Sequence, residues 1–208
     1  MRKYTTPIKT IQATISKMCY TLWDRIGITR FCLIWIIFIT VLISCDQKTA
    51  RTIDMYNTSK DMVGTVKLTE EPDGVKAKVK VEGLSTGFHG IHIHEFPDCS
   101  GPEFKNAGNH LNPTGKEHGL MNSKGAHLGD LPNIKVGSDG KMKGEVTIID
   151  ATLLDGKNTV KESSVIITEK ADDGISQPGG ESGKRIICGE ITEKGDKESP
   201  TDSTDIKK

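Results

Sequence analysis

The sequence has few aromatic residues, no excess of charge of either sign and no clear helical pattern. Aromatic residues make up 5% of its 208 residues, and 28 Lys and Arg balance 28 Asp and Glu. Basic residues never gather into a cluster longer than three, so the basic patch expected of a nucleic-acid-binding domain is missing and we expect no nucleic-acid partner. No segment has the 3.6-residue period of an amphipathic helix.

Long apolar runs are also scarce, and the single clear one is short. Residues 31–44 (FCLIWIIFITVLIS) carry no charge, but a membrane-spanning helix needs about 20 apolar residues. Arg25 and Arg30 precede this run and small Ser44 ends it, a pattern typical of a secretory signal. We therefore expect residues 1–44 to be a signal peptide, with Met1 or Met18 as the start. A short uncleaved membrane anchor is the alternative.

The residues that follow this run indicate a lipid anchor. The string LISC at 42–45 resembles a bacterial lipobox, in which the cysteine is lipidated and becomes the first mature residue. We expect an exported lipoprotein, held on a membrane through Cys45 and facing the periplasm or the cell exterior. Residues 45–208 carry 22 basic and 27 acidic residues, a net charge of −5. Their remaining cysteines, Cys99 and Cys188, are expected to pair in an exported chain.

Between two polar ends, apolar side chains recur mainly at every second residue. Residues 45–60 are expected to form a tether, and the charged residues 193–208 a disordered tail. In the expected domain, residues 61–192, apolar and charged side chains alternate over 75–82, as in a half-buried strand. Less regular runs lie at 62–69, 87–96, 143–150, 163–170 and 185–191. We predict an all-β antiparallel sandwich or flattened barrel, with a long functional loop over 97–133.

All six histidines fall between residues 89 and 127, in one strand and the long loop. His92 and His94 are two apart, so both imidazoles leave the same face of the strand. His110, His118 and His127 follow, with Asp130 three residues after the last. Imidazole suits zinc and copper, and three histidines with one carboxylate suit a tetrahedral zinc site. The pattern predicts a metal centre.

Seven strings together resemble the copper/zinc superoxide dismutases, in order and nearly in register. They are GFHGIHIHEF (87–96), AGNHLNP (107–113), KEHG (116–119), HLGDLPN (127–133), EKADD (169–173), SQPGG (176–180) and GKRIICGEI (183–191). The resemblance implies an eight-stranded Greek-key β-barrel and the dismutation of superoxide anion to oxygen and hydrogen peroxide. A homodimer is an assembly that the resemblance allows.

Carried over position by position, the resemblance assigns two metals and their supporting residues. The matched zinc ligands are His110, His118, His127 and Asp130, and the matched copper ligands are His92, His94 and the bridging His110. Arg185 matches the arginine at the mouth of the copper channel, which would hold superoxide. Asp172 matches a carboxylate that links a copper ligand to a zinc ligand. Cys99 and Cys188 match the family disulfide, and His89 matches a histidine that binds backbone and no metal.

One position departs from the family pattern. The fourth copper ligand of the family is a histidine directly before the EKADD string, and here that residue is Thr168. A neutral hydroxyl is a poor ligand for Cu(I), so copper retention and redox tuning are expected to suffer. Two hypotheses follow: a superoxide dismutase whose activity is weak or lost, or a non-catalytic lipoprotein that binds zinc and only weakly binds copper.

Overall fold

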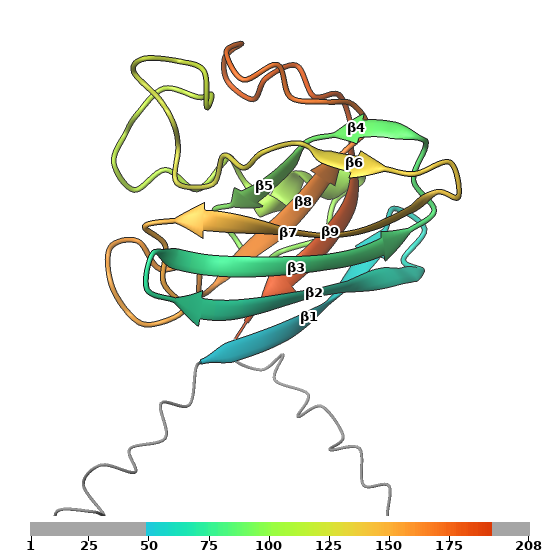
Figure 1. Ribbon diagram of the computed structural model, residues 1–208, viewed down its shortest axis with the longest axis horizontal. Coiled ribbons are helices and arrows are strands. Elements are labelled where there is room, and N and C mark those ends of the chain that lie inside the picture. The colour runs from blue at the N-terminus through green and yellow to red at the C-terminus, as the bar shows by residue number, and fades with distance from the viewer. Residues whose placement is uncertain (1–48, 193–208) are drawn as a thin grey trace, which may run out of the picture. The chain divides into compact units, whose positions relative to one another are not determined.

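The computed structural model describes residues 49–192, which form antiparallel β-structure with one short 3-10 segment (Figure 1). The strands are β1 (Ala50–Asn57), β2 (Met62–Glu71), β3 (Gly74–Glu82), β4 (Gly87–His89), β5 (Ile91–His94), β6 (Ile134–Val136), β7 (Lys141–Ile149), β8 (Ser163–Thr168) and β9 (Arg185–Ile191). The 3-10 segment, η1, spans Pro102–Ala107. The predicted all-β class is confirmed.

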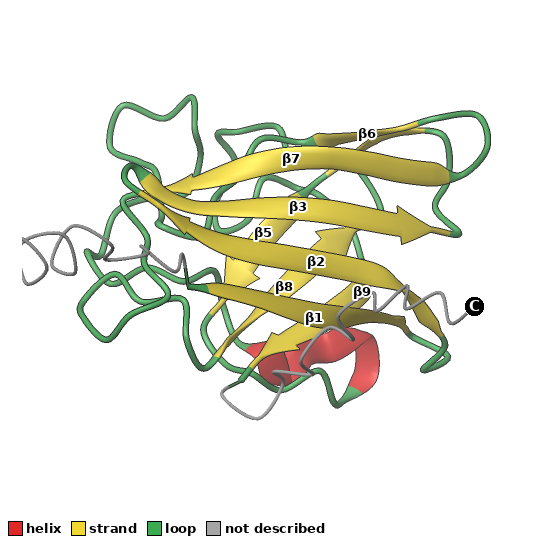
Figure 2. Cartoon of the chain, turned by 60° about the horizontal axis from the view of Figure 1, so that its bottom comes forward, coloured by secondary structure: helices red, strands yellow, loops and turns green. Residues whose placement is uncertain are grey.

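The strands close into a barrel. Seven of them form one sheet in the order β5-β8-β9-β1-β2-β3-β7, and β4 pairs with β6 in a second, two-stranded sheet. Because β4 leads through Gly90 into β5 and β6 packs against β7, the neighbours run full circle. Counting β4 and β5 as one broken strand gives the expected eight. Figure 2 shows β1, β2, β3 and β7 as a layer in front of β5, β8 and β9.

Alternation along the strands places the core between these layers. On β3, the residues Val75, Ala77, Val79 and Val81 are buried while the lysines between them face solvent. The same period buries Val66 and Leu68 on β2. The main core consists of Val, Ile, Leu, Met and Ala side chains without an aromatic ring. Its stability therefore rests on many aliphatic contacts, each fully buried side chain contributing roughly 1.5–3 kcal/mol.

The predicted tether over 45–60 is wrong from residue 50 onward, because Ala50–Asn57 is the strand β1. This strand pairs with β2 along most of its length and with β9 at Tyr56 and Asn57. Ile53 and Met55 point into the core, at 4% and 0% exposure. Two apolar residues among polar ones are too weak a pattern to predict a strand. The strand forms because β2 and β9 pair with its two edges.

The single strand predicted over 87–96 is divided. Gly87–His89 pairs with β6, whereas Ile91–His94 pairs with β8 in the large sheet. Gly90 stands at the break, where an added Cβ would lie 2.5 Å from the Thr168 hydroxyl oxygen. The three-residue strand β6 follows the predicted loop over 97–133 and was not expected. After the break, β5 lies beside β8 in the large sheet, and the long loop bridges to both of its histidines, His92 to Asp130 and His94 to His110.

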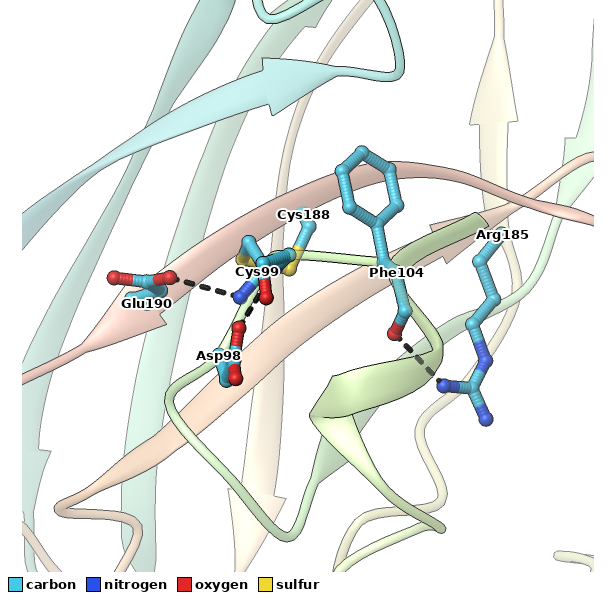
Figure 3. The surroundings of a disulfide bond; sticks show 7 residues. Asp98, Cys99, Phe104, Arg185, Cys188 and Glu190 are labelled. Atoms are coloured by element: carbon cyan, nitrogen blue, oxygen red, sulfur yellow. Dashed lines mark hydrogen bonds between the residues drawn. A yellow bond between two sulfur atoms is a disulfide. The ribbon is translucent and has the colours of Figure 1, made fainter. Parts of the chain in front are cut away.

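The disulfide expected between Cys99 and Cys188 is present (Figure 3). It joins positions 89 residues apart, with the Cα atoms separated by 5.7 Å. The Cys99 N–H also donates a hydrogen bond to the Glu190 carboxylate at 2.8 Å. The start of the long loop is thus tied to β9 beside the metal-binding region.

Several predictions concern residues outside 49–192. The signal peptide over 1–44, the lipid on Cys45 and the disordered tail over 193–208 all lie outside the described residues. Among residues 49–192, no helix has the length and apolar character to cross a membrane.

Candidate metal centre

Strand β5 presents two histidines to the outside of the barrel. Ile91 and Ile93 enter the core, so the intervening His92 and His94 face the opposite way, as a strand requires. The long loop covers them, leaving 0% and 2% of their surfaces exposed. Two imidazoles side by side and shielded from water are suited to bind one metal ion.

Three further histidines surround the carboxylate of Asp130. The Nδ1 atoms of His110, His118 and His127 lie 2.7, 3.0 and 3.3 Å from Asp130 Oδ1. The other oxygen, Oδ2, accepts hydrogen bonds from the N–H groups of Gly119 and His127. Burial opposes ionisation of Asp130, but the His110 hydrogen bond and the Gly119 N–H outweigh it and lower the pKa of Asp130. The ligand atoms of these four residues lie within 4.8 Å of one another, and three imidazoles with one carboxylate are a donor set that zinc accepts.

His110 also belongs to a second cluster. Its ring stacks on that of His92 with centroids 4.1 Å apart, and the ligand atoms of His92, His94 and His110 lie within 4.8 Å of one another. His92 Nδ1 and His94 Nε2 are buried without a hydrogen-bond partner. Burial, with nearby His110 and Arg185, lowers the pKa of His94 to about 2, and burial also lowers that of His92. Both rings are neutral, and each offers a free lone pair to a metal ion.

Asp172 joins the two clusters. Its carboxylate accepts hydrogen bonds from His92 Nε2 at 2.7 Å and from His118 Nε2 at 3.2 Å. Burial disfavours the Asp172 anion, but hydrogen bonds from His92 and the Gly174 N–H lower its pKa to about 2. Because Asp172 contacts the Nε2 atoms of His92 and His118, the Nδ1 atoms of both rings are left to bind a metal ion. Asp172 therefore lies between the two clusters, in contact with one histidine of each.

The hydroxyl of Thr168 is engaged with backbone carbonyls. The Thr168 side chain is 3% exposed, and its hydroxyl lies 3.3 Å from the Gly90 carbonyl oxygen and 3.2 Å from that of Lys170. Both neighbours are acceptors, so the hydroxyl hydrogen is directed to a backbone carbonyl. His89 lies behind it, with its ring nitrogens 2.8 and 2.9 Å from the carbonyl oxygens of Thr168 and Ser85. As expected, His89 stands outside both clusters.

Arg185 is fixed near His94 by backbone oxygens. Its two terminal nitrogens donate to the carbonyls of Phe104 at 3.1 Å and Gly108 at 2.8 Å; Figure 3 draws the first. The Gly108 carbonyl also accepts a hydrogen bond from His94 Nδ1 at 3.0 Å. Sequence reasoning missed these carbonyls, because every residue carries one and no residue type signals its use.

Comparison with known proteins decides the family. The family model for copper/zinc superoxide dismutase (SODC) matches residues 62–191. The chain belongs to the copper/zinc superoxide dismutase family. Among curated relatives, a copper/zinc superoxide dismutase of Aquifex aeolicus is 40% identical over 143 residues, which cover 66% of this chain and 84% of the relative. A superoxide dismutase-like protein of Bacillus subtilis is 38% identical over 152 residues, covering 70% and 78%.

Solved structures of the family show the same fold. The Bacillus subtilis superoxide dismutase-like protein matches with a TM-score of 0.66 and 35% identity, over 68% of this chain and 97% of that one. The Cu/Zn superoxide dismutase of Brucella abortus matches with a TM-score of 0.60 and 30% identity, over 69% and 99%. The matched part is therefore almost the whole of the Brucella chain.

Proposed function

We propose that the protein binds zinc through His110, His118, His127 and Asp130, and copper through His92, His94 and His110. The family as a whole is one of copper and zinc proteins. The convergence of three Nδ1 atoms on Asp130 favours zinc at the first cluster. Neutral imidazoles with unpartnered nitrogens favour copper at the second.

The reaction supported by this arrangement is the dismutation of superoxide, with weak or lost turnover. Bound copper would take an electron from one superoxide and return it to a second, which with two protons gives oxygen and hydrogen peroxide. Arg185, held by two carbonyls near His94, would bind the anion by charge-assisted hydrogen bonds. Asp172 would hold the rings of His92 and His118 in their ligating orientation.

The observation behind weak turnover is the hydroxyl of Thr168. The proposed copper site contains three histidines, and one of them, His110, also belongs to the proposed zinc site. When His110 acts as a zinc ligand alone, His92 and His94 remain, and Thr168 is turned toward the Gly90 and Lys170 carbonyls. Cu(I) prefers soft or imidazole ligands, so two histidines without a third donor would hold it poorly.

The same observation favours a second candidate, a non-catalytic zinc-binding protein with weak copper binding. Solved structures of the Bacillus subtilis superoxide dismutase-like protein include a double mutant with a tyrosine and a proline changed to histidine. A family-like barrel therefore occurs in a protein that is named only superoxide dismutase-like. Both candidates use the same proposed zinc ligands, which are His110, His118, His127 and Asp130.

Metal content and activity separate the two candidates. Wild type, Thr168→His and the control Thr168→Val are loaded with zinc and copper, and bound metals and superoxide consumption are measured. We expect wild type to hold zinc firmly, to lose copper on reduction and to turn over slowly. Thr168→His is expected to retain Cu(I) and gain activity, whereas Thr168→Val should not. Full copper occupancy with fast turnover in wild type would refute the role given to Thr168.

We also propose that lipid on Cys45 holds the protein on a membrane outside the cytoplasm. The support is the charge-free run 31–44, whose end forms the string LISC with Cys45, and the polar stretch that follows Cys45. Membrane fractionation and mass spectrometry of Cys45 compare wild type with Cys45→Ser. The variant is expected to lose the lipid mass and leave the membrane fraction, and an unmodified Cys45 in wild type would contradict the anchor.

A further inference from the structure

The outer face of β2, β3 and β7 carries a concentration of lysines. We name it the lysine face, and it consists of Lys67, Lys76, Lys78, Lys80, Lys141 and Lys143. Residues 49–192 contain 17 basic and 21 acidic residues, so about a third of the basic side chains of a negatively charged domain lie on three adjacent strands. All except the half-buried Lys76 are exposed.

Strand register places like charges opposite one another on this face. Lys67 is the partner of Lys78 across β2 and β3, and Lys80 is the partner of Lys143 across β3 and β7. Like charges in such positions destabilise a sheet, so the barrel itself gains nothing from them.

Acidic neighbours neutralise only half of the lysine face. Its ion pairs are Lys76 with Glu71 at 3.9 Å, Lys78 with Glu145 at 3.1 Å and Lys141 with Glu82 at 3.2 Å. Within residues 49–192, Lys67, Lys80 and Lys143 have no ion pair. Three ammonium groups therefore remain for an external anion.

An apolar side chain accompanies these amines. An open cavity of about 400 Å³ lies over β3, between β2 and β7, and its lining includes Lys80, Lys143 and Met62. Met62 is 53% exposed. A lipid headgroup region offers phosphate to the amines and an apolar boundary to the thioether, whereas a soluble polyanion offers charge alone. The combination favours a phospholipid surface as the partner.

The start of the barrel lies beside the same face. In the register of β1 and β2, Ala50 is opposite Thr69 and Thr52 is opposite Lys67. Cys45 is five residues before Ala50, so an extended chain would span at most about 17 Å between them. This step rests on the lipid proposed for Cys45. Such an anchor would keep the lysine face within reach of the bilayer.

We propose that the lysine face rests on an anionic phospholipid surface and directs the metal centre away from it. The ligands His92 and His94 lie on β5, in the layer behind β2, β3 and β7 (Figure 2). Packed β-layers are about 10 Å apart, so residues on the outside of the second layer lie farther from the bilayer than the Debye length of about 8 Å in the surrounding solvent. The barrel then adheres through lysines while Arg185 faces the compartment from which superoxide arrives.

Vesicle binding tests the proposal without the lipid on Cys45. Protein carrying Cys45→Ser, purified with its bound metals, is mixed with vesicles of phosphatidylcholine alone or of phosphatidylcholine with phosphatidylglycerol, and bound protein is measured by sedimentation. The face variant combines Lys67→Gln, Lys80→Gln and Lys143→Gln. We expect wild type to bind the anionic vesicles only, and added salt to weaken this binding. In the face variant, the affinity for these vesicles is expected to fall by roughly 100-fold.

A matched variant controls for total charge. Lys105→Gln, Lys116→Gln and Lys157→Gln remove the same charge from exposed positions outside the lysine face and are expected to leave binding nearly unchanged. Circular dichroism and thermal unfolding establish that each protein is folded. Equal losses in the two variants, or no preference of wild type for anionic vesicles, would overturn the proposal. Binding of soluble polyphosphate without vesicle binding would overturn the lipid assignment. None of these results depends on Cys45 or on copper.

Discussion

Replacing Asp172 by asparagine is expected to weaken both metal sites at once. The Asp172 carboxylate accepts hydrogen bonds from His92 Nε2 at 2.7 Å, His118 Nε2 at 3.2 Å and the Gly174 N–H at 2.6 Å. An asparagine has one accepting oxygen, and its NH₂ group would face a donor in place of the second. At least one imidazole then loses the acceptor that fixes its tautomer and orientation.

The magnitude follows from what such supporting carboxylates contribute. Loss of a hydrogen-bond partner behind a metal-binding histidine lowers metal affinity by about 10- to 100-fold, which corresponds to about 1.4–2.7 kcal/mol. Because Asp172 contacts a residue of each cluster, we expect losses of this size for zinc and for copper. If Asp172 supported a histidine of one cluster alone, the substitution would lower the affinity for one metal and leave the other unchanged.

Equilibrium competition with chelators measures the two affinities separately. Asp173→Asn is the matched control, because Asp173 is the neighbouring carboxylate and its contacts are with the N–H groups of Ile175 and Ser176. We expect this control to keep both affinities. Unchanged zinc and copper affinities in Asp172→Asn would refute the conclusion that Asp172 couples the clusters.

Three further predictions concern stability. Cys99→Ser opens a disulfide that closes 89 residues, and urea unfolding should show a loss of about 4–5 kcal/mol; a loss below 1 kcal/mol would contradict the chain-entropy account. Gly90→Ala places a Cβ 2.5 Å from the Thr168 hydroxyl oxygen and 2.9 Å from His92 Cε1, so we expect the free energy of unfolding to fall by about 1–3 kcal/mol. Burial lowers the pKa of His92, and that of His94 to about 2. The unfolded chain therefore takes up protons below about pH 6.5 that the folded chain does not. Metal-free protein should lose about 1.4 kcal/mol per pH unit from His94 as the pH falls toward 5, with a further loss from His92. A flat urea midpoint between pH 7 and 5 would contradict this.

Strand β1 marks a limit of pattern reasoning. Its apolar residues Ile53 and Met55 are flanked by Thr52, Asp54 and Tyr56, a weak alternation that resembles a polar tether. The strand exists because β2 and β9 offer their edges to it. Strand propensity depends on such neighbours more than on local sequence, so only the assembled barrel identifies this element.

The break between β4 and β5 has a similar cause. Residues 87–96 resemble a single strand because apolar and polar side chains alternate on each side of Gly90, but the phase changes there, since Phe88 and Ile91 are three residues apart. The two halves pair with different partners, β6 and β8, that lie about 50 and 70 or more residues downstream. The location of a partner strand in the barrel is absent from the local pattern.

The sequence alone identified the candidate metal ligands and the two-residue spacing of the first pair. The two-residue spacing of His92 and His94 places both rings on one side of a strand, and the absence of a histidine at Thr168 is visible without coordinates. The tertiary structure decided which nitrogen of each ring is free. Asp172 is 80 residues from His92, and the Gly108 carbonyl serves both His94 and Arg185. These hydrogen bonds join distant segments and backbone groups, so they arise only when the barrel closes and the long loop folds over β5.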